Sequence, residues 1–226
     1  MEDKRRVIAG YFDHTLLKAF ATEEDIENLC REAKEVHTYS VCVNPSYVAL
    51  CHRLLADSDV KVCSVIDFPL GCSDLDSKQY ECEQAIAHGA DEIDYVLHIG
   101  RVKMHDWDYI RLEMERLTDL CHSKGAGIKV IFETCYLNTD EITQLTKIAK
   151  EVKPDFIKTS TGFGTEGATV ENVKRMVEEA DGQVKVKASG GIRDWATCKA
   201  MLDAGASRIG VSASLAILDE INTELV

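Results

Sequence analysis

Short apolar runs rich in valine and isoleucine recur along this 226-residue chain, and longer amphipathic stretches separate them. The runs predict strands at eight places, namely residues 10–13, 40–43, 61–66, 92–97, 127–132, 155–159, 184–188 and 208–211. Eight strands that alternate with helices favour a parallel sheet closed into a barrel. A doubly wound open sheet is the alternative, but no G-x-G-x-x-G motif follows the first strand. We therefore predict an α/β protein, a (β/α)8 TIM barrel that forms a single domain over residues 1–226.

The predicted helices carry recognisable start and stop signals. Residues 22–36, 108–123 and 139–152 have apolar side chains at helical spacing, and the first of these segments opens with a capping-box-like Thr22-Glu23-Glu24-Asp25. Gly89 and Gly205 each stand between a helical segment and the next strand, which is typical of glycines just beyond a helix end.

Composition excludes several classes of function. A formal net charge of −13 disfavours nucleic acid or an anionic membrane as a partner. No apolar run approaches the roughly 20 residues that span a bilayer, and residues 1–6 lack the apolar stretch of a secretory signal. We expect a cytoplasmic protein whose nine cysteines are reduced. The seven histidines show no zinc-binding spacing, so we expect no structural zinc site; no cofactor is expected either.

Two lysines at strand ends carry the strongest chemical signal. Lys158 ends the sixth predicted strand and Lys187 ends the seventh, and a loop rich in glycine, serine and threonine follows each. An apolar strand disfavours an ammonium group, and two nearby ammonium groups favour loss of a proton from one of them. A neutral lysine is a nucleophile that forms a Schiff base with a carbonyl substrate. A carboxylate partner for each lysine is the alternative, but the pair of lysines favours catalysis.

Acidic residues inside the predicted strands are the candidate partners of these lysines. Asp94 lies within the apolar fourth strand, where it either accepts an ammonium group, shuttles protons through a bound water, or forms a structural ion pair. Asp13 lies at the end of the first strand, beside the eighth strand of a closed barrel, and could orient other groups from behind the site. His14 is better explained as a core histidine with satisfied hydrogen bonds.

Glycine-rich segments follow the sixth, seventh and eighth predicted strands. Barrel enzymes often bind phosphate with the loops after strands seven and eight and a helix N-terminus. We therefore predict a phosphate site that is formed by these loops, with Arg193 adding positive charge from the rim. The candidate residues are Thr161, Gly162, Gly190, Gly191, Ile192, Arg193, Gly210 and Ser212.

These segments resemble the deoxyribose-phosphate aldolase family of class I, Schiff-base aldolases. The resemblance covers nearly the full length, and its most specific parts are Lys158-Thr159-Ser160-Thr161-Gly162-Phe163 and Lys187-Ala188-Ser189-Gly190-Gly191. It implies a metal-independent lyase of deoxyribonucleotide catabolism. The enzyme would reversibly cleave 2-deoxy-D-ribose 5-phosphate to D-glyceraldehyde 3-phosphate and acetaldehyde.

The resemblance also implies roles for residues and a state of assembly. Lys158 would form the Schiff base, Lys187 would activate it and help in proton transfer, and Asp94 would act through a water as acid and base. Thr15 and Cys42 would lie near the substrate. The expected partners are a small phosphorylated sugar and aldehydes, with a homodimer as the assembly.

Several positions depart from the family pattern and leave phosphate affinity and substrate range open. They are Asp67, His98, Glu166, Ala213 and Lys185. Two other functions also remain open from the residues alone. One is a barrel aldolase that uses a ketose phosphate as donor, and the other is a catalytically silent protein that only binds a phosphorylated metabolite.

Overall fold

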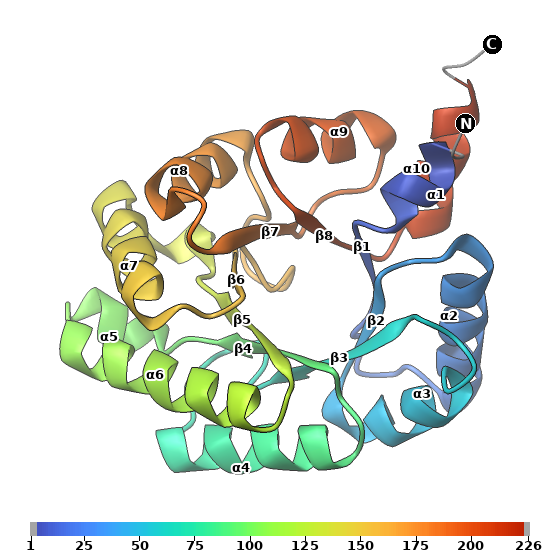
Figure 1. The fold of residues 1–226 in the computed structure, drawn as a ribbon. Coiled ribbons are helices and arrows are strands. Elements are labelled where there is room, and N and C mark those ends of the chain that lie inside the picture. The colour runs from blue at the N-terminus through green and yellow to red at the C-terminus, as the bar shows by residue number, and fades with distance from the viewer. Residues whose placement is uncertain (1–3, 224–226) are drawn as a thin grey trace.

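The computed structural model describes residues 4–223, and within them eight parallel strands close into one barrel in the order β1 to β8 (Figure 1). The predicted TIM barrel is therefore confirmed. The strands are β1 (Phe12–Leu16), β2 (Ser40–Val43), β3 (Lys61–Ile66), β4 (Glu92–Val96), β5 (Gly127–Ile131), β6 (Phe156–Lys158), β7 (Lys185–Ser189) and β8 (Arg208–Val211).

Helices surround this barrel on the outside (Figure 1). They are α1 (Lys4–Ala9), α2 (Glu23–Val36), α3 (Val48–Leu54), α4 (Leu75–Ala87), α5 (Ile99–Lys103), α6 (Trp107–Ser123), α7 (Thr139–Val152), α8 (Val170–Ala180), α9 (Trp195–Asp203) and α10 (Ser214–Thr223). Two short 3-10 turns, η1 (Pro45–Tyr47) and η2 (Thr134–Tyr136), follow β2 and β5.

The local signals read from the sequence set several helix boundaries. Thr22 caps α2, and the reciprocal bonds between Thr22 and Asp25 form the predicted capping box. Gly89 and Gly205 have φ values of 104° and 98°, which glycine adopts without the steric cost that other residues meet. Both glycines lie just beyond helix ends, as predicted.

The first strand was predicted two residues too early. Residues 10–13 were expected to form it, but β1 begins at Phe12 and continues to Leu16. The short helix α1 precedes it, and the N–H of Gly10 donates to the carbonyl of Arg6 at 3.1 Å. Gly10 and Tyr11 therefore form the turn after α1, and Asp13 lies within β1 rather than at its end.

Successive side chains along each strand point alternately toward the surrounding helices and toward the inside of the barrel. Side chains such as Val41, Ile93, Val130 and Ile209 are buried in the main hydrophobic core, whose other members lie largely on the surrounding helices. The intervening positions carry polar and charged side chains that contact one another across the inside of the barrel. Barrel interiors are more often filled by branched apolar residues, so a charged interior indicates a function for it.

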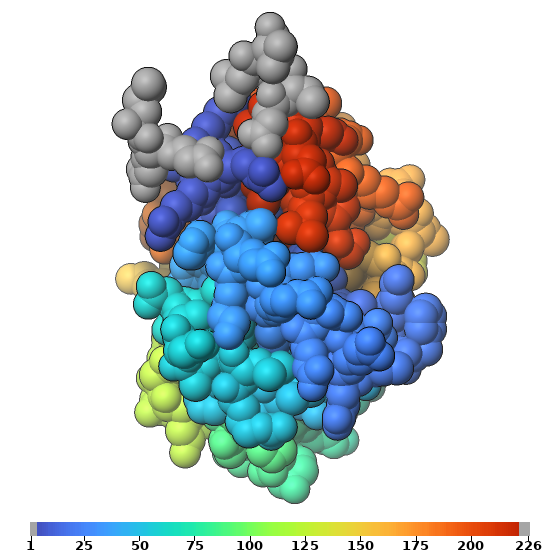
Figure 2. All heavy atoms as spheres, turned by 90° about the vertical axis from the view of Figure 1, so that its right-hand side faces the viewer, coloured from blue at the N-terminus to red at the C-terminus, as the bar shows by residue number. Residues whose placement is uncertain are grey.

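The two ends of the described chain lie side by side on one flank. Helices α1 and α10 pack together, with Arg5 and Asp219 forming an ion pair at 3.0 Å (Figure 1). Figure 2 shows the same flank, where the blue N-terminal segment and the red C-terminal helix share one surface. No helix within residues 4–223 has the length and apolar character needed to cross a membrane.

Candidate active site

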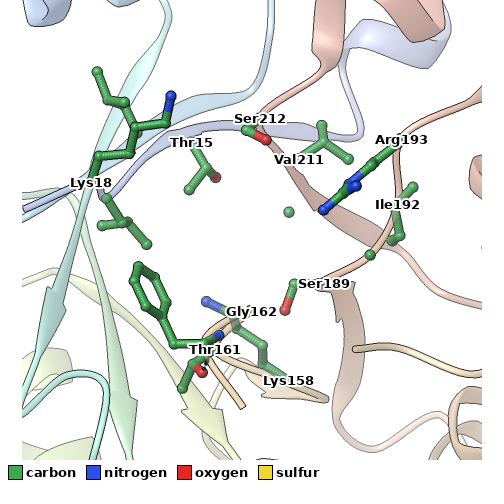
Figure 3. Close-up of a pocket in the computed structure, with 16 residues that line it drawn as sticks. Thr15, Lys18, Lys158, Thr161, Gly162, Ser189, Ile192, Arg193, Val211 and Ser212 are labelled. Atoms are coloured by element: carbon green, nitrogen blue, oxygen red, sulfur yellow. Dashed lines mark hydrogen bonds between the residues drawn. The ribbon is translucent and has the colours of Figure 1, made fainter. Parts of the chain in front are cut away.

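A pocket of about 300 Å³ opens among the loops that follow β1, β6, β7 and β8. Figure 3 shows the amine of Lys158 and the guanidinium of Arg193 pointing into this space from different walls. Its size suits a small sugar phosphate. The pocket is lined by Thr15, Leu16, Leu17, Lys18, Lys158, Thr161, Gly162, Phe163, Ser189, Gly190, Gly191, Ile192, Arg193, Gly210, Val211 and Ser212.

Most of the residues singled out from the sequence lie together in this lining, including all eight of the candidate phosphate residues. Four others do not line the pocket. Asp13, Asp94 and Lys187 are buried. Cys42 is buried in a small cluster with Cys63 and Val65, against which Leu17 and Phe68 pack.

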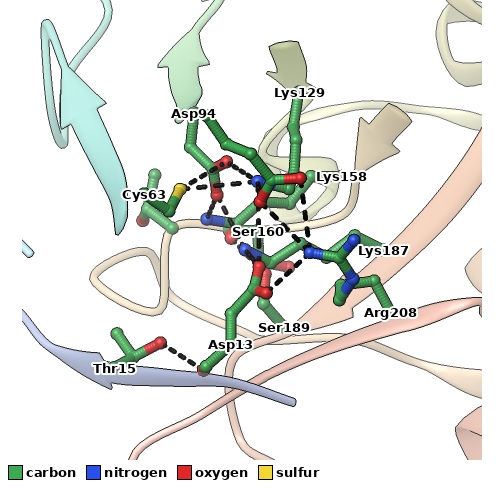
Figure 4. A network of polar contacts seen from close by, with 12 residues as sticks. Asp13, Thr15, Cys63, Asp94, Lys129, Lys158, Ser160, Lys187, Ser189 and Arg208 are labelled. Atoms are coloured by element: carbon green, nitrogen blue, oxygen red, sulfur yellow. Dashed lines mark hydrogen bonds and ion pairs between the residues drawn. The ribbon is translucent and has the colours of Figure 1, made fainter. Parts of the chain in front are cut away.

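A buried charge cluster joins Lys158 to the inside of the barrel (Figure 4). One oxygen of Asp94, Oδ2, accepts hydrogen bonds from Lys158 Nζ at 2.7 Å and from Lys187 Nζ at 2.8 Å. The other oxygen, Oδ1, accepts from Lys129 Nζ at 2.8 Å and from Cys63 Sγ at 3.1 Å. One carboxylate therefore holds three lysines together.

Asp13 supports the cluster from the opposite wall. Its Oδ2 atom pairs with Lys187, while Oδ1 accepts from Arg208 at 2.9 Å and from Ser40 at 2.7 Å. Burial alone would raise the pKa of Asp13, but Lys187, Lys129 and Arg208 together lower it below its ordinary value.

The same balance acts on Asp94. Its complete burial would raise its pKa, but Lys129, Lys158 and Lys187 outweigh burial and hold the pKa well below its ordinary value. Asp94 is therefore ionised and can only accept hydrogen bonds.

Two of the three lysines are held in the charged form. Burial alone would lower the pKa of Lys187, but Asp13 and Asp94 raise it above its ordinary value. Asp94, Cys63 and Glu92 raise the pKa of the buried Lys129 in the same way. Lys158 is the remaining lysine, and of the three it alone lines the pocket.

Within the described chain, this cluster contains four basic side chains and three carboxylates. The basic members are Lys129, Lys158, Lys187 and Arg208, and the acidic members are Asp13, Glu92 and Asp94. An arginine keeps its proton in proteins. The basic side chains therefore outnumber the carboxylates by one, and an uncompensated buried charge is costly.

Three members of this cluster were missed by the sequence analysis. Lys129 lies in the apolar strand β5, Glu92 has the same strand parity as Asp94, and Arg208 begins β8. The signal that identified Lys158, a charged residue inside an apolar strand, was present at Lys129 as well. Strand register brings them together, since Asp94 pairs with Lys129 and Lys187 pairs with Arg208 in neighbouring strands.

Glycines keep space for the lysines and for close loop packing. A Cβ atom at Gly210 would lie 3.1 Å from Cε of Lys187 and 2.9 Å from Cβ of Ser189. A Cβ atom at Gly167 would lie 2.2 Å from the carbonyl oxygen of Gly190. Glycine at these two positions therefore allows the pocket wall to close around the site.

Asp67, where the family commonly has glycine, has a structural explanation. It keeps a left-handed φ of 44°, and its carboxylate lies 3.0 Å from Nζ of the fully buried Lys78. Lys78 also pairs with Glu113 at 2.7 Å and donates to the carbonyl of Val96 at 2.8 Å. Asp67 therefore provides a second carboxylate for a buried ammonium group.

The other departures lie away from the pocket floor. His98 caps α5 by accepting from the N–H of Arg101 at 3.3 Å. Glu166 is exposed and Ala213 is partly buried, and neither lines the pocket. Lys185 lies at the start of β7, where its amine is 5.5 Å from the centre of the Phe156 ring. It is exposed there, at the end of β7 away from the loop that lines the pocket.

His14 connects two helices rather than entering the pocket. Its Nδ1 atom lies 2.8 Å from Oγ of Ser214 at the start of α10, and its Nε2 atom lies 2.9 Å from Glu32 on α2. Burial lowers the pKa of His14, although Glu32 opposes this effect. It is a buried histidine with both ring nitrogens hydrogen-bonded.

One group in the described chain could offer three ligand atoms to a metal ion. Cys42, Cys63 and Asp94 place such atoms within 4.8 Å of one another. Asp94 already accepts hydrogen bonds from three lysines, and the positive charges of Lys129 and Lys187 oppose a cation at the same place. The arrangement is better suited to lysine chemistry than to metal binding.

Comparisons with known proteins identify close relatives. The model of the DeoC/LacD family of aldolases matches residues 7–220. A deoxyribose-phosphate aldolase of Thermoanaerobacter sp. (strain X514) is 49% identical over 216 residues, which cover 95% of this chain and 97% of that protein. One from Thermococcus gammatolerans is 48% identical over 214 residues, 94% of this chain and 95% of that protein.

A solved structure shows the same architecture. The deoxyribose phosphate aldolase from Aeropyrum pernix is 33% identical, with a TM-score of 0.91. The match covers 99% of this chain and 94% of that one.

Proposed function

This chain belongs to the deoxyribose-phosphate aldolases of the DeoC/LacD family, and we propose that Lys158 forms the Schiff base of the reaction. The observation that carries this assignment is the buried cluster with one more basic than acidic side chain, in which Lys158 is the only lysine that lines the pocket. A neutral amine at the pocket wall is the form that attacks a carbonyl carbon.

In the cleavage direction, the Lys158 amine adds to the C1 aldehyde of open-chain 2-deoxy-D-ribose 5-phosphate. The hydroxyl group of the resulting carbinolamine takes up one proton and leaves as water, which gives a protonated imine, an electron sink; the later hydrolysis returns this proton. The C3 hydroxyl then gives up its proton, the C2–C3 bond breaks, and its electron pair forms an enamine through C2, C1 and nitrogen. D-Glyceraldehyde 3-phosphate leaves as the first product.

The second half of the reaction returns the enzyme to its starting state. The enamine takes a proton at C2 and becomes the imine of acetaldehyde, and water hydrolyses this imine to acetaldehyde and free Lys158. We assign the proton transfers to Asp94, acting through a bound water as base and then as acid. Its Oδ2 atom lies 2.7 Å from Lys158 Nζ, so the carboxylate stands next to the reacting nitrogen.

Lys187 and Asp13 have supporting roles in this proposal. Lys187 stays cationic between the two carboxylates, so it opposes a second positive charge nearby and favours the neutral amine at Lys158. Asp13 holds Lys187 and Arg208 in place from β1.

The substrate phosphate would bind where the loops after β6, β7 and β8 meet. Gly162, Gly190 and Gly191 have φ values of 87°, 83° and 78°, so these turns carry no Cβ atoms that would keep an anion from the backbone. Arg193 points into the same space and adds a positive charge (Figure 3). Thr15 on β1 and Ser212 after β8 also line the pocket and carry hydroxyl groups.

We also propose a homodimer in the cytoplasm. All nine cysteines are free thiols, as expected in a reducing compartment. The relative from Aeropyrum pernix is described as tetrameric, so light scattering on the purified protein decides between the two assemblies.

Borohydride trapping with acetaldehyde tests the nucleophile. We expect a stable two-carbon adduct on Lys158 by peptide mass mapping, and no turnover in a folded Lys158→Met variant. Lys185→Met is the matched control, because it removes an exposed lysine at the far end of a neighbouring strand. An adduct on Lys187 would reverse the two lysine roles, and the absence of any adduct would refute Schiff-base chemistry here.

A further inference from the structure

A buried glutamate, Glu133, contacts the loop after β6 but does not line the pocket described above. It follows β5, is 1% exposed, and has a left-handed φ of 53°. Such a conformation costs a non-glycine residue about 1 kcal/mol or more, so it persists only where surrounding contacts fix it. Neither the sequence analysis nor the reaction steps above give Glu133 a role.

The carboxylate of Glu133 takes both hydrogen-bond donors of one pocket residue, Thr161. The N–H of Thr161 donates to Oε1 at 3.2 Å, and the hydroxyl of Thr161 donates to Oε2. The N–H of Phe163 in turn donates to the Thr161 hydroxyl oxygen at 3.0 Å. Glu133 therefore fixes the backbone of residues 161–163, the segment that contains Gly162.

Backbone contacts extend this effect to the next loop. Gly162 and Gly190 are so close that a Cβ atom on Gly190 would lie 3.4 Å from Cα of Gly162. The N–H of Ala168 donates to the carbonyls of Ser189 and Gly190 at 3.0 and 3.1 Å. The loops after β6 and β7 therefore pack as one unit, and Glu133 is hydrogen-bonded to the part of this unit that contains Thr161.

We propose that Glu133 is a positioning residue that holds the loops after β6 and β7 in the shape that binds the sugar phosphate. This inference rests on the proposed function, because it assigns the phosphate to these loops. Glu133 acts through Thr161 and Gly162 and does not touch the reacting carbons, so it controls substrate affinity more than the Schiff-base steps.

The variant Glu133→Gln tests this role with almost no change in volume. An ionised carboxylate offers acceptors to both Thr161 donors, whereas an amide places its NH2 group against one of them. We expect KM for 2-deoxy-D-ribose 5-phosphate to rise about tenfold, the size of one weakened hydrogen bond to a charged acceptor. We expect kcat to change less than about threefold, and acetaldehyde trapping on Lys158 to proceed at the wild-type rate.

Glu141→Gln is the matched control. Glu141 is also a buried glutamate after β5, but it caps α7 through Asn138 and pairs with Lys103, without contact to Thr161. Its variant should keep the wild-type KM. Unphosphorylated 2-deoxy-D-ribose provides a second control, because its kcat/KM should fall much less than that of the phosphorylated sugar in Glu133→Gln.

Thr161→Val removes the hydroxyl group that donates to Glu133, so it tests the same contact. It also tests the proposal if Glu133→Gln does not fold. It should raise KM to a similar extent, and Thr161→Ser should restore the wild-type value. In the double variant, the two effects should not add, because both remove one interaction. A wild-type KM in Thr161→Val, an unchanged KM in folded Glu133→Gln, or an equal loss with both sugars would overturn the proposal. Failure of the wild-type protein to cleave the phosphorylated sugar would instead refute the proposed function.

Discussion

Replacing Asp94 by asparagine should reduce both activity and stability, and the loss of stability should depend on pH. Asp94 is fully buried and its two oxygens accept from three lysines at 2.7 to 2.8 Å. Asparagine keeps the shape but removes the negative charge. The cluster would then contain four basic side chains and two carboxylates, with an amide NH2 group facing one of the ammonium groups.

The magnitude follows from the burial of these groups. Removing one partner from a buried ion pair costs about 3 to 5 kcal/mol, because the remaining charges lose their compensation. Domains are stable by about 5 to 15 kcal/mol, so the variant should fold with a reduced margin. Turnover should fall roughly a hundredfold or more if Asp94 transfers protons as proposed.

The pH dependence follows from the direction of the pKa shift. The pKa of Asp94 is lower in the folded state than in the unfolded state, where it is about 3.9. Its contribution to stability is therefore present above that pH, and it is lost as the pH falls toward the folded-state pKa. The difference in unfolding free energy between wild type and variant should be largest from pH 5 to 9 and should shrink at pH 3.

Urea unfolding followed by the fluorescence of Trp107 and Trp195 measures this difference at each pH. Asp106→Asn is the matched control, because Asp106 caps α6 and forms a partly exposed pair with Arg101. Asparagine caps a helix about as well as aspartate, and such a pair contributes about 1 kcal/mol or less. A difference below about 1 kcal/mol for Asp94→Asn at pH 7, or one that stays constant down to pH 3, would refute the electrostatic argument.

Two further substitutions probe the surroundings of the cluster. Gly210→Ala would place a methyl group 3.1 Å from Cε of Lys187. We expect kcat of the folded variant to fall roughly ten- to a hundredfold, because the methyl group displaces the lysine side chain. An unchanged kcat would show that Lys187 has room to move. Asp67→Asn removes one of the two carboxylates that pair with the buried Lys78. Urea unfolding should show a decrease of about 3 kcal/mol in the free energy of unfolding. A decrease within about 0.5 kcal/mol of zero would mean that Glu113 alone compensates the charge of Lys78.

Periodicity along the chain was sufficient to predict the barrel, because alternation of short apolar runs with amphipathic helices has few other solutions. Strands β2, β3 and β8 match their predicted bounds, and in each a polar residue follows directly after the last apolar residue. The start of β1 was misplaced because Gly10 and Tyr11 extend the apolar pattern into the turn after α1. A turn that contains apolar residues cannot be separated from a strand by periodicity alone.

The charge cluster was only partly predictable for a different reason. A charged residue in an apolar strand indicates that a partner of opposite charge is present, but the sequence does not identify that partner. Asp94 was expected to interact with a lysine, whereas in the structure its two oxygens are shared among Lys129, Lys158 and Lys187. That sharing depends on the register of four strands and on barrel closure. No role for Glu133 could be inferred from the sequence, because its contact with Thr161 depends on a left-handed turn after β5.

The separation of a hydrophobic outer layer from a charged interior explains how the barrel tolerates so many buried charges. The apolar faces of the strands pack against the helices, and that burial stabilises the fold without using the barrel interior. The interior can then hold a cluster whose charges do not balance. One excess positive charge is unfavourable when all four basic groups are protonated, and the neutral Lys158 of the proposed mechanism would remove it. The same imbalance that weakens the fold would therefore favour the neutral amine that the proposed Schiff-base step needs.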